Sequence, residues 1–308
     1  MAVNLASASH HRRICSPDDR IMDAAAFLLS LLAAAIVLYP LIFIVSCSFS
    51  EPAEVALGHV VLLPKGFTLE GYQHILEFKD IWIGYRNTLF YTVVGTLMNL
   101  SVTLPAAFAL SRKDMPGNGL FTGLFTFTMF FSGGLIPTYL VYKQLHMTNT
   151  IWCMLIPGMI TMWNTVVCRT FFSSSIPYEL QEAAKIDGCG DIRLFVRIIL
   201  PLSMPIIAVM TMYYAVGHWN AYFNAMIYLS DRNLYPLQLF LRNILLLDAV
   251  NDLMGADPDA MRDALRLAQL KESMKYGIIV VSALPMLVMY PFFQKYFVKG
   301  AMVGAIKG

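Results

Sequence analysis

The sequence predicts an all-α integral membrane protein with six transmembrane helices and a cytoplasmic coupling helix between helices 4 and 5. Three observations lead to this fold class. Hydrophobic residues make up 57% of the chain and charged residues only 14%, whereas a soluble domain carries about 25% charged residues. Six windows of at least 19 residues contain no Asp, Glu, Lys or Arg. Lysine and arginine are unevenly divided among the loops between these windows.

The charge-free windows give the membrane spans. They cover residues 24–50, 87–111, 115–142, 144–168, 198–230 and 276–294. A helix needs about 20 apolar residues to cross the hydrocarbon core, and inside lipid it satisfies its own backbone hydrogen bonds. We therefore expect six spanning helices, which we place at about 24–46, 87–111, 120–142, 150–170, 198–226 and 275–297.

The loops assign the two sides of the membrane. Loops on the N-terminal side carry 12 Lys and Arg in 71 residues, against 10 in 93 on the other side. The positive-inside rule then places both termini in the cytoplasm. We expect a cytoplasmic N-terminal segment (1–22), a transmembrane domain (23–300) and a cytoplasmic tail (301–308). The transmembrane domain contains a coupling loop (172–197) and an external loop (227–274).

The fifth predicted span is unusually polar. Gly217 to Asn224 bring a histidine, a tryptophan, two asparagines and a tyrosine into an otherwise apolar stretch. Polar side chains within a membrane usually face the interior of a helix bundle or a wet cavity. We expect a cavity here, although packing between helices explains any single one of these residues equally well.

The loop before this span has the residues of a short helix. Ser175 can cap its start, Pro177 fits its first turn, and Glu179 and Glu182 favour its N-terminal half. Gly188 can adopt the left-handed conformation that ends a helix.

A second helix is expected directly after the first. Asp191 can cap it, and it leads through Leu200-Pro201 into the fifth span. We expect the first helix to be joined rigidly to the fifth span through this second helix. Ala183 and Ala184 would leave one surface of the first helix small, so that another protein can approach closely.

This loop resembles the hallmark of a known family. Glu182-Ala183-Ala184, Gly188, Ile198 and Leu200-Pro201 stand at the spacings found in permease subunits of bacterial, binding-protein-dependent ATP-binding-cassette (ABC) importers. Other stretches are similar to the carbohydrate permeases, in particular the maltose-type second subunit: 87–89, 109–112, 132–139, 217–220 and 235–238. The tail from Lys295 to Gly308 resembles permeases for oligosaccharides or uronate-containing polysaccharides.

The resemblance implies a multi-pass protein of the bacterial cytoplasmic (inner) membrane, with a set of partners and roles. A second, different permease subunit would complete the pore, two ATPase subunits would bind ATP and Mg²⁺, and a periplasmic or lipid-anchored solute-binding protein would deliver an oligo- or polysaccharide. The ATPase-coupling residues would be Glu179, Glu182, Ala183, Ala184, Asp187 and Gly188. Aromatic stacking and hydrogen bonding suit sugars, so the substrate pathway would include Trp219, Asn220, Tyr222 and Asn224, of which at most two or three share a helical face.

Other function classes fit the sequence less well. A phosphate loop of the form G-x-x-x-x-G-K-[ST] is absent from the sequence, so we expect no ATPase activity, bound cofactor or metal in this chain. The net charge of +2 argues against nucleic-acid binding. An ion-coupled secondary sugar transporter is the first alternative, although the spans lack carboxylates. An enzyme acting on lipid-linked sugars is the second, although catalytic clusters at the membrane face are missing.

Overall fold

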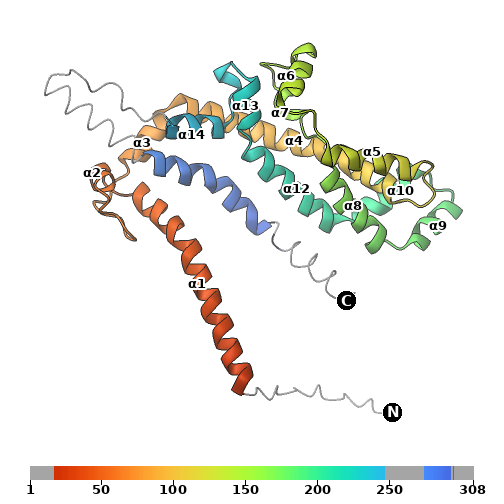
Figure 1. Cartoon of the computed structure of the whole chain (residues 1–308), viewed down its shortest axis with the longest axis horizontal. Coiled ribbons are helices and arrows are strands. Elements are labelled where there is room, and N and C mark those ends of the chain that lie inside the picture. Colours follow the sequence, from red (N-terminus) through yellow and green to blue (C-terminus); the bar gives the residue numbers. More distant parts are fainter. Residues whose placement is uncertain (1–16, 247–273, 293, 295–308) are drawn as a thin grey trace.

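The computed structural model describes residues 17–246, 274–292 and 294, and these residues form helices without a strand (Figure 1). The first half contains α1 (Pro17–Ser48), α2 (Pro52–Ala56), α3 (Glu70–Glu77), α4 (Lys79–Ser111), α5 (Asn118–Phe130) and α6 (Leu135–Gln144). The second half contains α7 (Trp152–Leu155), α8 (Met162–Ser175), α9 (Tyr178–Ile186), α10 (Asp191–Leu194), η1 (Phe195–Ile199), α11 (Leu200–Leu202), α12 (Met204–Trp219), α13 (Phe223–Tyr228), η2 (Arg232–Leu234), α14 (Leu237–Leu246) and the C-terminal helix Met274–Phe292. The predicted all-α class is confirmed.

The number of continuous spans is smaller than predicted. Within the described ranges, three helices are long and apolar enough to cross a membrane unbroken: Ile21–Ser48, Lys79–Ser111 and Met274–Phe292. Two further spans are bent pairs, α5 with α6 at 114° and Asp191–Leu202 with α12 at 83°. They occupy the third and fifth predicted spans. The structure thus has three to five spans by length and composition, and the predicted count of six is not confirmed.

The fourth predicted span, 150–170, is interrupted. Its residues form α7 and α8, and the stretch between them is not helical. Pro157 lacks an N–H group and Gly158 has a φ of 72°, so an α-helical hydrogen-bond ladder does not pass through this point. Proline and glycine were visible in the sequence, but their combined effect was to break the helix rather than to kink it.

A buried polar contact compensates for this interruption. The Asn99 side-chain nitrogen donates to the carbonyl oxygens of Gly158 and Met159, both at 2.9 Å. The Asn99 carbonyl oxygen lies 2.7 Å from Nε2 of His218 on α12. Non-helical backbone at membrane depth is tolerated where protein groups satisfy it. Asn99 therefore joins α4, the interruption and α12.

Helix α4 is the axis of the bundle. It has 33 residues, which corresponds to a length of about 50 Å, and α12, α8 and α14 make the most extensive contacts with it (Figure 1). Its buried face carries small and polar side chains, including Gly95, Asn99 and Thr103. A Cβ atom on Gly95 would lie 2.5 Å from the His218 ring, so a larger residue would push α12 away. Small residues of this kind allow membrane helices to approach closely.

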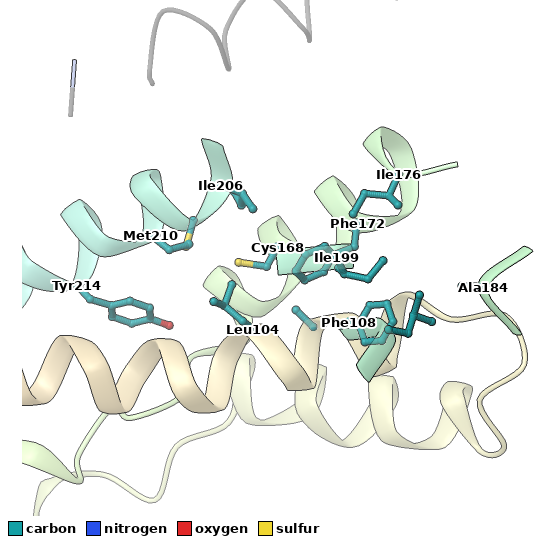
Figure 2. Packing of buried hydrophobic residues seen from close by; sticks show 12 residues of the cluster. Leu104, Phe108, Cys168, Phe172, Ile176, Ala184, Ile199, Ile206, Met210 and Tyr214 are labelled. Atoms are coloured by element: carbon teal, nitrogen blue, oxygen red, sulfur yellow. The ribbon is translucent and has the colours of Figure 1, made fainter. Parts of the chain in front are cut away.

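One end of α4 packs into the largest buried cluster (Figure 2). Leu104 and Phe108 of α4 share this cluster with side chains from α8, α9, η1 and α12, among them Cys168, Phe172, Ala184, Ile199, Ile206 and Met210. This cluster fixes the predicted coupling loop against the bundle.

The other end of α4 holds the polypeptide between α13 and α14. The Asn87 side-chain nitrogen donates to the carbonyl oxygens of Asn233 and Tyr235, at 2.6 and 3.0 Å. The Tyr91 hydroxyl donates to the carbonyl oxygen of Leu234 at 2.9 Å. Segment 229–238 is therefore attached to the first half of α4, far from the coupling loop.

Helix α1 extends away from the rest of the chain (Figure 1). Its most apolar 18-residue window has no residue buried inside this chain. Contact with the bundle is made near its end, where the Phe43 ring packs edge-on against Tyr276 at 5.9 Å between centroids. The apolar surface of α1 is thus available to lipid or to another protein.

Candidate functional site

Helix α9 has two different surfaces. Gln181 and Ala184 are buried, and Ala184 belongs to the cluster that surrounds the end of α4 (Figure 2). Glu179, Glu182 and Ala183 are exposed. The expectation that Ala183 and Ala184 form one small outer surface was wrong, because adjacent residues lie about 100° apart around a helix.

The start of α9 also differs from the prediction. Ser175 is the last residue of α8 rather than a cap, and Pro177 occupies the N-cap position rather than the first turn. The residue before a proline is disfavoured in the α conformation. Ile176 is accordingly extended, with φ −110° and ψ 115°, and α9 cannot begin until Pro177 has been passed.

Gly188 ends α9 as predicted. Its φ is 74°, in the left-handed region. The N–H of Gly188 donates to the carbonyl of Lys185 at 3.0 Å, and the N–H of Cys189 donates to that of Ala184 at 2.9 Å. This pair of bonds is the Schellman motif. Asp191 is the first residue of α10, and Gly190, not Asp191, stands at its N-cap.

The connection from α10 to α12 is bent rather than straight. α10, η1 and α11 follow one another directly as far as Leu202, and the chain then turns by 83° into α12. Pro205 has no N–H to donate to the carbonyl four residues earlier, so the ladder stops there. The side chain of Ser203 at the bend is fully buried and donates to the carbonyl of Ile199 at 2.7 Å. The expected rigid connection therefore contains a fixed angle.

Four charged side chains connect the coupling loop to the turn after α4, and we call them the ion-pair cluster: Arg112, Asp114, Lys185 and Asp191. Arg112 donates to both carboxylate oxygens of Asp114, at 2.9 and 2.7 Å, and to Asp191 at 2.5 Å. Lys185 of α9 donates to Asp114 at 2.6 Å. Hydrogen bonds from Arg112 and then Lys185 hold the pKa of Asp114 well below its usual range.

The predicted substrate-pathway residues lie apart from one another. Trp219 is buried, and its indole N–H donates to the carbonyl of Ser282 in the C-terminal helix at 3.0 Å. Asn220 and Tyr222 are exposed, and Asn224 is half-buried. A cavity of about 400 Å³ lies between α12 and the C-terminal helix. Among the described residues its lining contains Trp219 and Asn220 but neither Tyr222 nor Asn224.

Comparison with known families adds a decisive observation. Residues 81–242, more than half of the chain, match the sequence model of the family described as binding-protein-dependent transport system inner membrane component. The chain belongs to this family. The matched region of the permease contains α4 from its third residue, the interruption after α7, the coupling loop and α12.

Individual relatives match the permease over almost its whole length. Protein LplC of Bacillus subtilis is 39% identical over 94% of this chain and 96% of the relative. The polygalacturonan/rhamnogalacturonan transport system permease protein YtcP of the same organism is 36% identical over 94% of this chain and 99% of the relative. A crystal structure of a bacterial ABC transporter involved in import of the acidic polysaccharide alginate contains a chain that is 33% identical, with a TM-score of 0.82 over 92% of this chain and 98% of that one.

Two residues of the permease's loop were missed by sequence reasoning. The Ile186 and Ile192 side chains are 86% and 83% exposed, on either side of the Gly188 turn. Ile186 shares its helix surface with Glu179, Glu182 and Ala183, because these positions follow the i, i+3, i+4, i+7 spacing. Helical periodicity could have identified this surface and excluded Ala184 from it.

Proposed function

We propose that this chain is one of two different permease subunits of an ATP-driven ABC importer that takes up an acidic, uronate-containing oligo- or polysaccharide. The observation that carries the proposal is the full-length likeness to two proteins of related cargo. A polygalacturonan/rhamnogalacturonan permease and a chain of an alginate importer each align with more than nine tenths of this chain. Both cargoes are polymers with carboxylated sugars.

In this proposal, the coupling loop faces the cytoplasm and docks on an ATPase subunit. The docking surface consists of the exposed side of α9 with Ile186, together with Ile192 beyond the turn. Two exposed isoleucines at a polar loop favour burial against another protein, since each fully buried isoleucine side chain stabilises a complex by about 1.5–3 kcal/mol. Ala184 supports the docking surface from behind rather than touching the partner.

The proposed pathway of this chain is neutral. Trp219 and Asn220 border the cavity beside the C-terminal helix, and the stretch 198–230 contains no charged residue. A tryptophan ring and an amide suit the ring faces and hydroxyls of a sugar. Selection for carboxylates would therefore be made by the other permease or by the solute-binding protein, where arginine can pair with a carboxylate.

Uptake by reconstituted vesicles tests the proposed function. The chain, the second permease and the ATPases are placed in vesicles with the solute-binding protein outside, and trigalacturonate is compared with maltotriose. We expect ATP-dependent uptake of trigalacturonate alone. Uptake driven by an ion gradient without ATP would contradict the importer mechanism, and equal uptake of the neutral trisaccharide would contradict the substrate class.

A glycine pair tests the docking loop. Gly188→Ala places a Cβ atom on a left-handed residue, which costs roughly 1 kcal/mol and deforms the end of α9. Gly190→Ala is the matched control, because Gly190 has a φ of −70° and open space around its Cα. We expect Gly188→Ala to reduce copurification of the ATPase about fivefold and Gly190→Ala to leave it unchanged. Equal copurification by both variants would count against docking through this loop.

A further inference from the structure

The ion-pair cluster joins three segments that are distant in the sequence. Arg112 and Asp114 follow α4, Lys185 belongs to α9 and Asp191 begins α10. The Arg112 side chain is only 11% exposed, and its guanidinium also lies over the Phe108 ring at 5.8 Å from the centroid. A guanidinium held by two carboxylates and an aromatic ring has a fixed orientation, because its planar fork of donors matches carboxylate geometry.

Ion pairs replace close packing at this point of the coupling loop. A cavity of about 580 Å³ separates the end of α4 and the turn after it from α10, with Pro105, Met115 and Ile192 in its lining. Arg112, Asp114, Lys185 and Asp191 also line this cavity. Across this gap, the charged side chains connect α9 and α10 to the end of α4.

The opposite end of α4 is attached to another segment in a similar way. Asn87 and Tyr91 donate to backbone carbonyls of segment 229–238, and the Thr88 hydroxyl accepts from the N–H of Leu237 at 2.8 Å. Arg232 of this segment forms an ion pair with Asp80 in the first turn of α4. Figure 1 shows α4 running from α13 and α14 at one end to α9 and α10 at the other.

We propose that Arg112 is a positioning residue of the transport cycle: by holding Asp114 and Asp191 together, it makes α4 move with the coupling loop, and α4 transmits this movement to segment 229–238. The inference rests on the proposed function, in which ATPase subunits move the coupling loop. It adds a second connection, since the loop is already joined to α12 through η1 and α11. α12 adjusts the cavity near Trp219, while α4 adjusts the opposite face of the membrane.

The helix α4 is suited to transmit displacement along its length. It is a single helix of 33 residues, and Asn99 and Thr103 tie its middle to the interruption and to α12. A movement at Arg112 therefore reaches Asn87 without passing through a loop. The ion-pair cluster adds a polar connection to the buried cluster around Leu104 and Phe108, so that the end of α9 and the start of α10 move with α4.

Hydrogen–deuterium exchange of segment 229–238 tests this inference without any sugar. The complete complex in lipid nanodiscs is compared with and without ATP and vanadate, which trap the closed ATPases. In the unmodified complex we expect ATP and vanadate to change the exchange rate of this segment. In Arg112→Gln we expect this change to fall about tenfold, because losing a charge-assisted hydrogen bond of ~1.5 kcal/mol shifts an equilibrium by that factor. ATP hydrolysis itself should remain.

Three further variants make the experiment specific. Arg197→Gln removes the same charge from an exposed arginine of η1 that takes no part in the ion-pair cluster, and it should behave as the unmodified chain. Asp191→Asn should reproduce Arg112→Gln, and it keeps the test decisive if Arg112→Gln does not fold, because the Asp191 side chain is 69% exposed. The double variant should lose no more than Arg112→Gln alone, since the Arg112–Asp191 contact that Asp191→Asn removes is already missing from Arg112→Gln.

The outcomes separate the inference from the proposed function. A full ATP-dependent change in segment 229–238 of Arg112→Gln, or no such change in the unmodified complex, would overturn the role of Arg112 and α4. If the double variant lost the product of the two single-variant factors in the exchange change, the role of Arg112 would be overturned as well. Failure of the chain to copurify with an ATPase would instead overturn the proposed function.

Discussion

Asp114 shows how one carboxylate can join several structural elements. It accepts hydrogen bonds from Arg112, two residues earlier, and from Lys185, 71 residues later. The side chain is 36% exposed, so water screens the attraction and each pair contributes modestly. The main effect of Asp114 is therefore geometric, because its two partners fix the position of α9 relative to the end of α4.

The depressed pKa of Asp114 predicts how the stability of the chain depends on pH. Because the folded-state pKa lies below the unfolded value of about 3.9, the stabilisation is present above that value and is lost as the pH falls through the folded pKa. We expect Asp114→Asn to lower the free energy of unfolding by on the order of 1 kcal/mol at pH 7. The difference from the unmodified chain should shrink below about pH 4.

Thermal unfolding in detergent between pH 7 and pH 3.5 measures this difference. Glu182→Gln is the control, since it removes a carboxylate from the exposed side of the neighbouring α9 and leaves the ion-pair cluster intact. A difference for Asp114→Asn that grows towards acid pH would contradict the assignment of its partners.

At the scale of an element, the nine residues of α9 form one surface that packs against the bundle and one that is exposed for docking. Ala183 and Ala184 are neighbours with the same side chain, yet Ala183 is exposed and Ala184 belongs to the buried cluster at the end of α4. The two alanines therefore allow the same chemical change to be made on either side of one helix.

Substituting leucine for each alanine tests the two surfaces of α9. Ala184→Leu inserts three carbons into a packed cluster and should lower the stability of the chain by about 1–3 kcal/mol. Ala183→Leu should leave the unfolding temperature unchanged and reduce copurification of the ATPase, because the added volume blocks close approach. Unfolding temperature and ATPase yield are measured for both variants. Equal unfolding temperatures would contradict the burial of Ala184.

The sequence predicted elements well where one local signal determines the backbone. Gly188 ends α9 in the left-handed conformation, as expected from a glycine after a helix with a basic last turn. The break after α7 was not predicted, because Pro157 and Gly158 alone permit either a kink or an interruption. The choice depends on Asn99, 59 residues earlier, which supplies the missing hydrogen bonds. Contacts over such distances leave no pattern in a single sequence.

The ion-pair cluster was missed for the same reason. Arg112, Asp114, Lys185 and Asp191 stand in two loops that look independent in the sequence, and only the folding of α4 against α8 and α12 brings these loops together. The substrate-pathway prediction for Trp219, Asn220, Tyr222 and Asn224 stays a prediction. The structure places the first two at one cavity and gives Trp219 a structural hydrogen bond in addition.

At the scale of the whole molecule, the coupling loop and segment 229–238 are attached to opposite ends of one apolar helix of 33 residues. If α4 crosses the bilayer, these two regions lie on opposite sides of it. The arrangement makes the orientation of the complete chain measurable at two exposed positions, Gly190 and Ser230.

Labelling of single cysteines tests this orientation. In a background without the five native cysteines, Ser230→Cys should react with a membrane-impermeant maleimide in intact spheroplasts, and Gly190→Cys should react only in inverted vesicles. The chain is expressed without the ATPases, so that Gly190 stays uncovered. Labelling of both positions from the same side would contradict the spanning of the membrane by α4, and a reversed pattern would contradict the cytoplasmic coupling loop.

The C-terminal helix has a consequence for biosynthesis. Its residues contact elements from across the chain: Tyr276 packs on Phe43 of α1, Gly277 touches Ile75 of α3, and Ser282 accepts a hydrogen bond from Trp219 of α12. The ribosome makes this helix after α1, α3 and α12. A nascent chain from which this helix is still missing lacks the contacts that the helix makes with α1, α3 and α12, so the bundle cannot close before the helix has been made. Products truncated before this helix therefore present to membrane proteases an indole N–H of Trp219 without its hydrogen-bond partner.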